Sequence, residues 1–374
     1  MATVLRWMTL GVGLFMVGGT LLNVSRSPHW FVRGWDYPRV QIALLAAASG
    51  GAYALWFSRG TEMDWLFMAA TAGCALWQIW RIYPYTTLAP VRVQQSRGSQ
   101  GDAGSAGDKR STVRLLVTNV LMENAQHDRL LQLIRESDPD LVLALETDEA
   151  WARALEPVRL THPHVIRHPR DNYYGLFLFS RLPLLEARVE FLVQDDIPSV
   201  HASFELAGER VFLYGLHPRP PEPIRDQDST PRDAELVIVG RMIGKAGDRP
   251  TIVAGDLNDV AWSPTSELFL RLSGLLDPRM GRGLYNSYNA DNRLFRYPLD
   301  HVFHSNHFRL VELQRCPHVG SDHFPMLIEL SYEPDAPAEQ AETESEAGDA
   351  PEAQEKLEEQ ADAASTGQDR PERE

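Results

Sequence analysis

Polar residues cluster at the ends of short apolar stretches, and their types could act on a phosphate ester. The stretches are rich in Leu, Val, Ile and Phe, which predicts buried strands. Because ligands bind at strand ends in sheets flanked by helices, we expect these positions to converge on one cleft. In chain order they are Asn119, Glu146, His217, Asp256, Asn258, Asp300, Asp322 and His323.

This set combines carboxylates, amides and imidazoles without any cysteine. Oxygen donors of this kind suit a hard divalent cation, and we expect Mg²⁺ or Mn²⁺ beside a phosphate ester. The two cysteines of the chain, Cys74 and Cys316, are too few for a disulfide framework or a thiolate metal site.

The order of these residues resembles the endonuclease/exonuclease/phosphatase superfamily, which includes deoxyribonucleases, apurinic endonucleases, inositol polyphosphate phosphatases and neutral sphingomyelinases. The resemblance covers roughly residues 112–332 and is most specific at 255–259 (Gly-Asp-Leu-Asn-Asp) and 320–325 (Gly-Ser-Asp-His-Phe-Pro). It implies an α/β fold, a four-layer sandwich of two packed mixed β-sheets with outer helices.

The resemblance implies a metal site formed by Glu146, Asn119 and Asp322. Taken alone, a strand-end carboxylate such as Glu146 is usually a solvated edge residue or a helix cap, and Asn119 would be a turn residue. Leu121 stands where apurinic endonucleases of this superfamily carry a second acidic residue, so the chain departs from that subtype.

The catalytic roles are likewise implied by the resemblance. Asp256 would orient or deprotonate the attacking water, and Asn258 would donate to a phosphate oxygen. His217 matches a phosphate-binding or proton-donating histidine. Asp300 would pair with His323, fix its tautomer and raise its pKa, which favours a charged ring beside a phosphate.

The net charge of −15 is concentrated at the C-terminus. Residues 333–374 hold fifteen Asp or Glu and three Lys or Arg, so the rest of the chain is close to neutral. It therefore lacks the strongly basic character of a dedicated duplex binder. Because the tail has almost no large apolar residue, we predict that residues 333–374 are disordered.

Residues 1–85 contain three apolar runs, at 7–24, 40–57 and 65–80. Each approaches the ~20 residues that a helix needs to cross a bilayer, and Trp and Tyr stand near the ends of the runs. We predict a membrane domain of three transmembrane helices. The alternative is a signal peptide before a soluble apolar domain, but no cleavage motif follows the first run.

Three spans would place the N-terminus and the catalytic domain on opposite sides of the membrane. Arg26, Arg33 and Arg39 lie in the first loop, whereas the other side has Arg6 and Arg59. Counting positive charges places the catalytic domain in the cytoplasm, and we expect a multi-pass protein of a bacterial inner membrane.

The remaining sequence predicts a linker and one catalytic domain. Residues 86–111 become rich in Gly and Ser and are expected to be a flexible linker. Within the catalytic domain, residues 112–332, helices predicted at 233–245 and 263–273 alternate with strands, whereas strands follow one another between 162 and 205. This alternation favours mixed sheets.

These features predict a membrane-anchored, Mg²⁺-dependent phosphohydrolase that cleaves phosphate mono- or diesters by metal-assisted attack of water. The expected partners are the bilayer and a phosphoester substrate, either a lipid headgroup or nucleic acid. A nuclease of the same superfamily and a catalytically silent, membrane-tethered binding module are the alternatives. A silent homologue should lack at least one of four residues, and all are present: Glu146, Asp256, Asn258 and His323.

Overall fold

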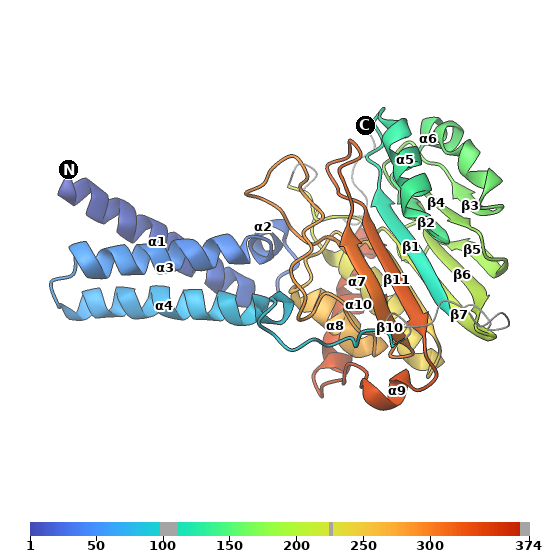
Figure 1. Cartoon of the computed structure of the whole chain (residues 1–374). Helices are drawn as coiled ribbons and strands as arrows, with labels where there is room; N and C mark the ends of the chain where they lie inside the picture. Colours follow the sequence, from blue (N-terminus) through green and yellow to red (C-terminus); the bar gives the residue numbers. More distant parts are fainter. Residues whose placement is uncertain (98–110, 224–226, 367–374) are drawn as a thin grey trace.

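Two β-sheets packed face to face form the larger part of the molecule, and a bundle of helices projects from it (Figure 1). The structure is a computed structural model and describes residues 1–97, 111–223 and 227–366.

The first sheet has six strands in the order β10-β11-β1-β2-β4-β3. Only β1 and β2 run parallel to each other, so the sheet is mixed. Its strands are β1 (Thr112–Asn119), β2 (Leu141–Leu145), β3 (His164–His168), β4 (Leu176–Ser180), β10 (Phe308–Arg315) and β11 (Met326–Tyr332).

The second sheet has five strands in the order β5-β6-β7-β8-β9. Here β7 and β8 are the parallel pair, and this sheet is also mixed. Its strands are β5 (Leu184–Glu190), β6 (Ser199–Leu206), β7 (Glu209–Leu216), β8 (Thr251–Asp256) and β9 (Asp300–His304).

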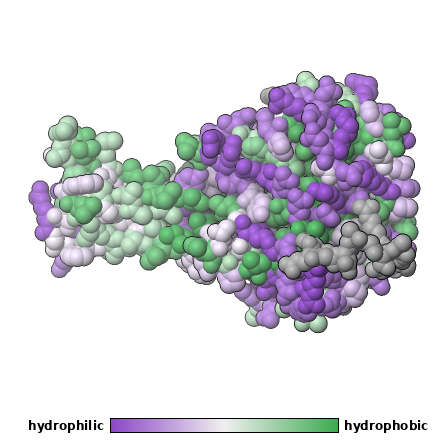
Figure 2. Space-filling view, viewed as in Figure 1, coloured by the Kyte–Doolittle hydropathy of each residue, from purple (hydrophilic) through white to green (hydrophobic). Residues whose placement is uncertain are grey.

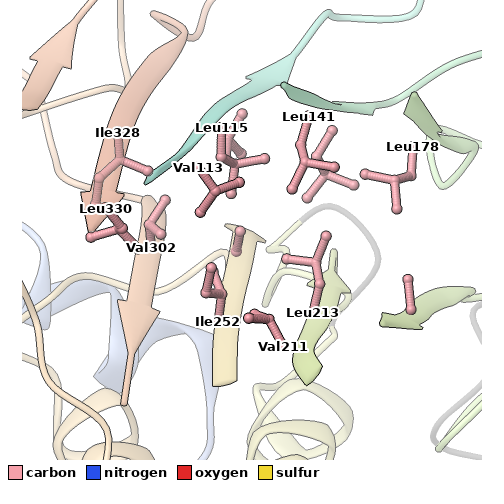
Figure 3. Close-up of a cluster of buried hydrophobic side chains, with 14 of the residues drawn as sticks. Val113, Leu115, Leu141, Leu178, Val211, Leu213, Ile252, Val302, Ile328 and Leu330 are labelled. Carbon is pink, nitrogen blue, oxygen red and sulfur yellow. The ribbon is translucent and has the colours of Figure 1, made fainter. Parts of the chain in front are cut away.

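The alternation of side chains along each strand builds the layers. In β1, Val113 and Leu115 point into the core between the sheets, whereas Leu116 points toward the outer helices. Figure 3 shows Val113 and Leu115 of the first sheet facing Ile252 and Leu213 of the second. Both faces of these strands are therefore buried, which explains their continuous apolar sequence.

Helices cover both outer faces of the sandwich. The six-stranded sheet is covered by α5 (His127–Ser137) and α6 (Glu149–Ala154), and the five-stranded sheet by α7 (Thr230–Ala246) and α8 (Pro264–Ser273). The Ser263 hydroxyl accepts a hydrogen bond from Ser266 N and caps α8, as its Ser-Pro sequence indicates. The predicted fold of two packed mixed sheets with outer helices is confirmed.

Three long helices form the N-terminal bundle: α1 (Ala2–Val24), α3 (Arg39–Trp56) and α4 (Glu62–Ile82). The short helices α2 (Trp30–Arg33) and η1 (Gly34–Asp36) connect α1 to α3, and η2 (Tyr83–Tyr85) follows α4. Among the described residues, only α1 is both long and apolar enough to cross a membrane.

The prediction of three membrane-crossing helices is therefore not confirmed, and α1 is the one candidate among the described residues. Gln, Ser and Gly lower the hydropathy of α3, and α4 carries Glu62, Asp64 and Arg81 near its ends.

The bundle docks directly on the catalytic sandwich. The Trp262 indole donates to the Asp36 carbonyl at 2.8 Å, and the Tyr85 hydroxyl donates to the Ala261 carbonyl at 2.6 Å. These contacts join the bundle to the segment that follows β8.

The first part of the predicted linker is packed rather than free. Val93 is fully buried in the core between the sheets, and Gln95 forms a bridge with Leu310 at the edge of β10. Unpaired edge groups of β10 bind this segment, which a composition rich in polar residues does not reveal. Of the rest, residues 98–110 lie outside the described residues.

The prediction of a disordered tail is wrong for most of its length. The helices α9 (Ala336–Glu339) and α10 (Asp349–Thr366) are ordered, and α10 packs on α7. Ala353 is buried beside Leu268, and Lys356 Nζ lies 2.7 Å from Asp233 Oδ2. Leu357 also packs on this cluster, and Asp349 pairs with Arg271 at 2.8 Å. These apolar contacts and ion pairs dock a helix that its composition alone would leave free. Residues 367–374 lie outside the described part of the chain.

Candidate active site

The predicted site residues meet where the parallel strand pairs end. Asn119 closes β1 beside Leu145 of β2, and Leu216 of β7 lies beside Gly255 of β8. These registers place Glu146 next to Asn119 in one sheet and His217 next to Asp256 in the other. A cavity of about 300 Å³ opens here, lined by Glu146, Asn172, Tyr173, Tyr174, His217, Pro220, Glu222 and Asn258.

Asn119 links the two sheets across the site. Its side-chain Nδ2 donates to Glu146 Oε1 at 2.7 Å and to Asp256 Oδ2 at 3.1 Å. Its Oδ1 accepts from Leu121 N at 3.1 Å, which fixes the orientation of the amide. The amide therefore holds two carboxylates from different sheets close to each other.

Glu146 is a strained and incompletely paired carboxylate. Its backbone is left-handed, with φ of 59°, and its buried Oε2 atom has no hydrogen-bond partner. Burial raises the pKa of Glu146 to about 7, against the opposing effects of the Asn119 hydrogen bond and the His323 charge. A cation beside Oε2 would satisfy this oxygen and favour its charged form.

Asp300 and His323 form the expected pair. His323 Nδ1 donates to Asp300 Oδ2 at 2.7 Å, and His323 Nε2 lies 3.5 Å from Asp256 Oδ2. Burial alone lowers the pKa of His323, but the charges of Asp300 and Asp256 raise it to about 10. The ring is therefore a charged imidazolium at neutral pH.

His217 lies on the other side of Asp256. Its Nε2 is 3.9 Å from Asp256 Oδ2, and its ring is 5.3 Å from the ring of Tyr174. Burial lowers the pKa of His217 to about 4, so this imidazole is neutral at pH 7. Its buried Nδ1 has no hydrogen-bond partner.

Asn258 closes the turn after β8 in a left-handed conformation, with φ of 51°. Its backbone N donates to Asp256 Oδ1 at 2.9 Å, and its side-chain Nδ2 donates to the Pro218 carbonyl at 2.9 Å. The Asn258 carbonyl accepts from Tyr37 of the helical bundle at 2.9 Å and from Arg232 at 2.8 Å. Asn258 thus joins the Asp256 turn to the loop after His217.

The protein-family comparison decides what kind of chain carries this geometry. Residues 116–323 match the model of the Endonuclease/Exonuclease/phosphatase family, which is more than half of the chain. The chain belongs to this family. It is accordingly an enzyme, a metal-dependent phosphoric ester hydrolase.

Several solved structures are similar to this family member. The human nocturnin catalytic domain with bound sulfate is 17% identical and covers 60% of this chain and 96% of its own, with a TM-score of 0.48. An endonuclease/exonuclease/phosphatase from Bacteroides vulgatus is 18% identical. The match covers 60% of this chain and 100% of the Bacteroides chain, also with a TM-score of 0.48. Sphingomyelinase C from Streptomyces griseocarneus is 16% identical. The match covers 58% of this chain and 99% of the sphingomyelinase chain, with a TM-score of 0.45. The search of curated proteins found no match.

The side chains present fit the divalent cation of the family. Among the described residues, one group of three possible metal donors lies within 4.8 Å: Asp256, Asp300 and His323. Within it, however, Asp300 and His323 satisfy each other, and a charged imidazole cannot bind a cation. The unpartnered Oε2 of Glu146 is the better donor. Asp322 is half-buried and accepts from the Ser321 hydroxyl at 3.4 Å, so its part in the metal site stays a prediction.

Sequence reasoning missed several residues around this site. The paired tyrosines before β4 were an available signal for the wall of the cavity, which contains Tyr174. No local signal marks Tyr37, which is 221 positions from Asn258. Arg232 is also buried, between Asp233 and Asp259 at 2.8 Å and 3.4 Å, and supports the same turn.

Proposed function

We propose that this protein is a membrane-anchored, Mg²⁺-dependent hydrolase of phosphate mono- or diesters. One observation carries the proposal: the free, buried Oε2 of Glu146 beside Asn119 and Asp256, within reach of a charged histidine. Oxygen donors of this kind suit Mg²⁺.

Glu146 would hold the cation together with Asp322. Asn119, predicted as a third ligand, instead turns its Nδ2 toward the carboxylates and would orient Glu146. When bound, Mg²⁺ supplies charge neutralisation at the phosphoryl oxygens. Its preference for oxygen donors and water explains why Glu146, rather than a cluster of histidines, would be the main protein ligand.

Asp256 would accept the proton of the attacking water. Asn119 and Asn258 N each donate to this carboxylate, and these bonds fix its direction. As the water oxygen bonds to phosphorus, the P–O bond to the leaving group breaks, and that oxygen takes the bonding electrons and then a proton from solvent water.

Charged His323, held by Asp300, would donate to a phosphoryl oxygen and stabilise the developing negative charge. Neutral His217 would donate a hydrogen bond to another oxygen of the same phosphoryl group. Asn258 would add a donor through its side chain, which has one amide hydrogen beyond the bond to Pro218.

The helical bundle supports the membrane anchor, because its outer surface is largely apolar, unlike that of a soluble domain. Large apolar side chains lie on the outside of all three helices, including Leu14, Leu44 and Leu76 at 59%, 66% and 67% exposure. Figure 2 shows a mainly hydrophobic bundle beside a mainly hydrophilic catalytic domain. We propose that α1 spans the bilayer and anchors the protein, with the apolar outer faces of α3 and α4 beside it.

Polar groups occupy part of the bundle interior, beside an apolar cluster that includes Met16 and Ile42. Gln78 is fully buried and donates to Thr20 and Asn23, both at 2.9 Å, and it accepts from Arg39 at 2.9 Å. Hydrogen bonds between helices, with apolar side chains facing outward, are typical of helices packed in lipid.

The proposal places the catalytic domain on the cytoplasmic face of a bacterial inner membrane. In the first loop, Arg33 and Arg39 both pair with Asp36, at 3.1 Å and 2.6 Å. The free positive charge of that loop is therefore smaller than the sequence count indicates, and protease access in sealed vesicles would decide the side.

The function is tested with the full-length protein in detergent and a panel of phosphatidylglycerol, sphingomyelin, inositol phosphates, nucleotides and DNA. Excess EDTA should abolish turnover, and Mg²⁺ or Mn²⁺ should restore it. Glu146→Gln should lower kcat about 100-fold or more while the fold is kept. Glu149→Gln, at an exposed position three residues later, is the matched control. Full activity in EDTA would contradict the proposal.

A further inference from the structure

An apolar groove runs along the bundle where it meets the catalytic domain. Its volume is about 370 Å³, within the roughly 300–1,000 Å³ typical of small-molecule sites. Its walls come from α1, the α2–η1 segment and the start of α3, and Phe295 of the catalytic domain closes one end. No charged residue lies among the groove residues that the structure describes.

Aromatic rings form much of the groove surface. The rings of Phe15 and Trp35 are 4.9 Å apart, and those of Phe31 and Trp35 are 6.3 Å apart. Phe15 and Phe31 are 61% and 48% exposed, so the groove offers a large apolar surface that the chain itself leaves uncovered.

The loop that carries Phe295, residues 288–297, connects the groove to the active site. At its tip, Leu294 and Phe295 are 76% and 52% exposed, and Gln41 of α3 donates to the Leu294 carbonyl at 2.6 Å. Figure 1 shows this loop, in orange, projecting beside α2. The tip therefore lies against the bundle with its apolar side chains in the open.

The base of the same loop contacts the catalytic residues. The ring of Tyr288 lies 4.9 Å from the ring of His323, and Ala290 N donates to the Asp322 carbonyl at 2.7 Å. One short loop thus borders the groove at its tip and the proposed phosphate site at its base.

We propose that the groove binds a hydrocarbon chain of a membrane phospholipid whose phosphoester is hydrolysed at the active site. This inference rests on the proposed function and names its substrate class. The groove is lined in part by α1, the helix that is long and apolar enough to cross a membrane, so it is continuous with the surface that would contact lipid. Leu45 of α3, which is 46% exposed, also lines the groove.

The charges beside the groove fit the same occupant. Arg293 is exposed next to Leu294, and Arg296 follows Phe295 while donating to the Asn289 and Ala290 carbonyls at 3.1 Å and 2.8 Å. Apolar side chains flanked by arginines suit the boundary between acyl chains and anionic headgroups.

Gly34 allows the groove to be filled without disturbing its walls. A Cβ at Gly34 would meet nothing within 4 Å, and its φ of −56° accepts any side chain. Gly34→Phe should therefore place a ring where the lipid chain would lie. Gly73→Phe is the matched control, because Gly73 also has open space but lies on α4, which does not line the groove.

The full-length variants are assayed on dioleoyl and dihexanoyl forms of phosphatidylglycerol, phosphatidic acid and sphingomyelin in phosphatidylcholine vesicles. Bis(p-nitrophenyl) phosphate and p-nitrophenyl phosphate serve as water-soluble substrates. Gly34→Phe should lower the ratio of kcat/KM on the dioleoyl lipid to that on the soluble ester at least about tenfold, mainly through KM. Gly73→Phe should leave this ratio unchanged.

A second measurement does not depend on activity or on that variant. Phosphatidylcholine with a photoactivatable acyl chain should label peptides containing Phe15, Trp35 or Phe295 in the wild type. Phe295→Ser, at an exposed loop position, should reduce this labelling. Labelling spread evenly over the apolar surface, crosslinks only between two copies of the chain, or an unchanged ratio in Gly34→Phe would overturn the groove assignment.

Cleavage of DNA with none of the lipids cleaved would overturn the substrate class while leaving the proposed hydrolase intact. Absence of turnover on every phosphoester, with the groove still labelled, would instead refute the proposed function.

Discussion

Asp256 lies between two imidazoles of opposite protonation state. Burial keeps His217 neutral, with a pKa of about 4, whereas Asp300 keeps His323 charged, with a pKa of about 10. Two histidines thus lie within 4 Å of one carboxylate oxygen, but at neutral pH only His323 carries a positive charge. Environment, rather than residue type, assigns their roles.

Replacing Asp300 with Asn should narrow the pH range of activity. In the wild type, His323 loses its proton only near pH 10, so the alkaline limb of the kcat/KM profile should fall there. Without the Asp300 charge, this limb should move toward the ordinary histidine value of ~6.5. Profiles are measured at saturating Mg²⁺, and an unchanged alkaline limb would refute the pairing.

The same pair has a defined effect on stability. Because the folded pKa of His323 is raised, the contribution of the pair to folding stability is fully present below pH ~6.5 and is lost as the pH rises through about 10.

The two residues should also act as one unit in catalysis. In a double-mutant cycle of Asp300→Asn and His323→Gln, the combined loss of kcat should be close to either single loss. Losses that multiply would show that the two residues act independently.

Mg²⁺ should stabilise the protein more at pH 8 than at pH 5.5. The raised pKa of Glu146, about 7, means that the folded protein without metal loses stability as the pH rises through that value. A proton competes with the cation at this carboxylate below pH 7. Thermal unfolding with and without Mg²⁺ measures the effect, and Glu146→Gln should remove its pH dependence.

At the scale of elements, the helical bundle supports the active-site turn. Tyr37 of the bundle and Arg232 of α7 both bind the Asn258 carbonyl, and Asn258 N in turn positions Asp256. The left-handed backbone of Asn258 is costly for a residue other than glycine, and these contacts hold it in place.

Tyr37→Phe should therefore lower kcat about tenfold with little change in KM, because a small displacement of Asp256 affects the reaction more than binding. Unfolding free energy should fall by only about 1 kcal/mol, the value of one hydrogen bond. Tyr83→Phe, which removes an exposed hydroxyl bond to Leu88, is the control. Faster hydrogen exchange at 256–260 in Tyr37→Phe alone would support the positioning role; equal kinetics in both variants would contradict it.

At the scale of the whole molecule, the bundle and the catalytic domain form one continuous structure rather than two tethered parts. Arg81 of α4 pairs with Glu267 of α8 at 2.8 Å, and residues 94–96 pair with Leu310 at the edge of β10. The site therefore keeps a set position relative to the bundle, which is consistent with the proposed hydrolysis of a bilayer lipid.

Extraction tests this arrangement. The full-length protein should remain in the membrane fraction after a carbonate wash, whereas a chain that begins at Thr112 should be soluble. That shorter chain should also be less active than the full-length protein in detergent, since it lacks Tyr37 and Tyr85. Recovery of the full-length protein without detergent would contradict the membrane proposal.

The sequence by itself determined which residues could form the site and that they lie at the ends of strands. Apolar strands with polar ends are encoded by neighbouring residues, so Asn119, Glu146 and Asp256 could be placed at strand ends from the sequence alone. The family motifs then paired Asp300 with His323, and the structure has them 2.7 Å apart.

Only the tertiary structure decided what depends on distant residues. The left-handed backbone of Glu146, the contact of Tyr37 with Asn258, and the docking of α10 by Lys356 have no local signal. A flexible linker and a disordered tail were predicted because these segments contain few apolar residues of their own. Whether such a segment folds depends on the surface that another part of the chain offers it, and a sheet edge and the face of α7 supply that surface here.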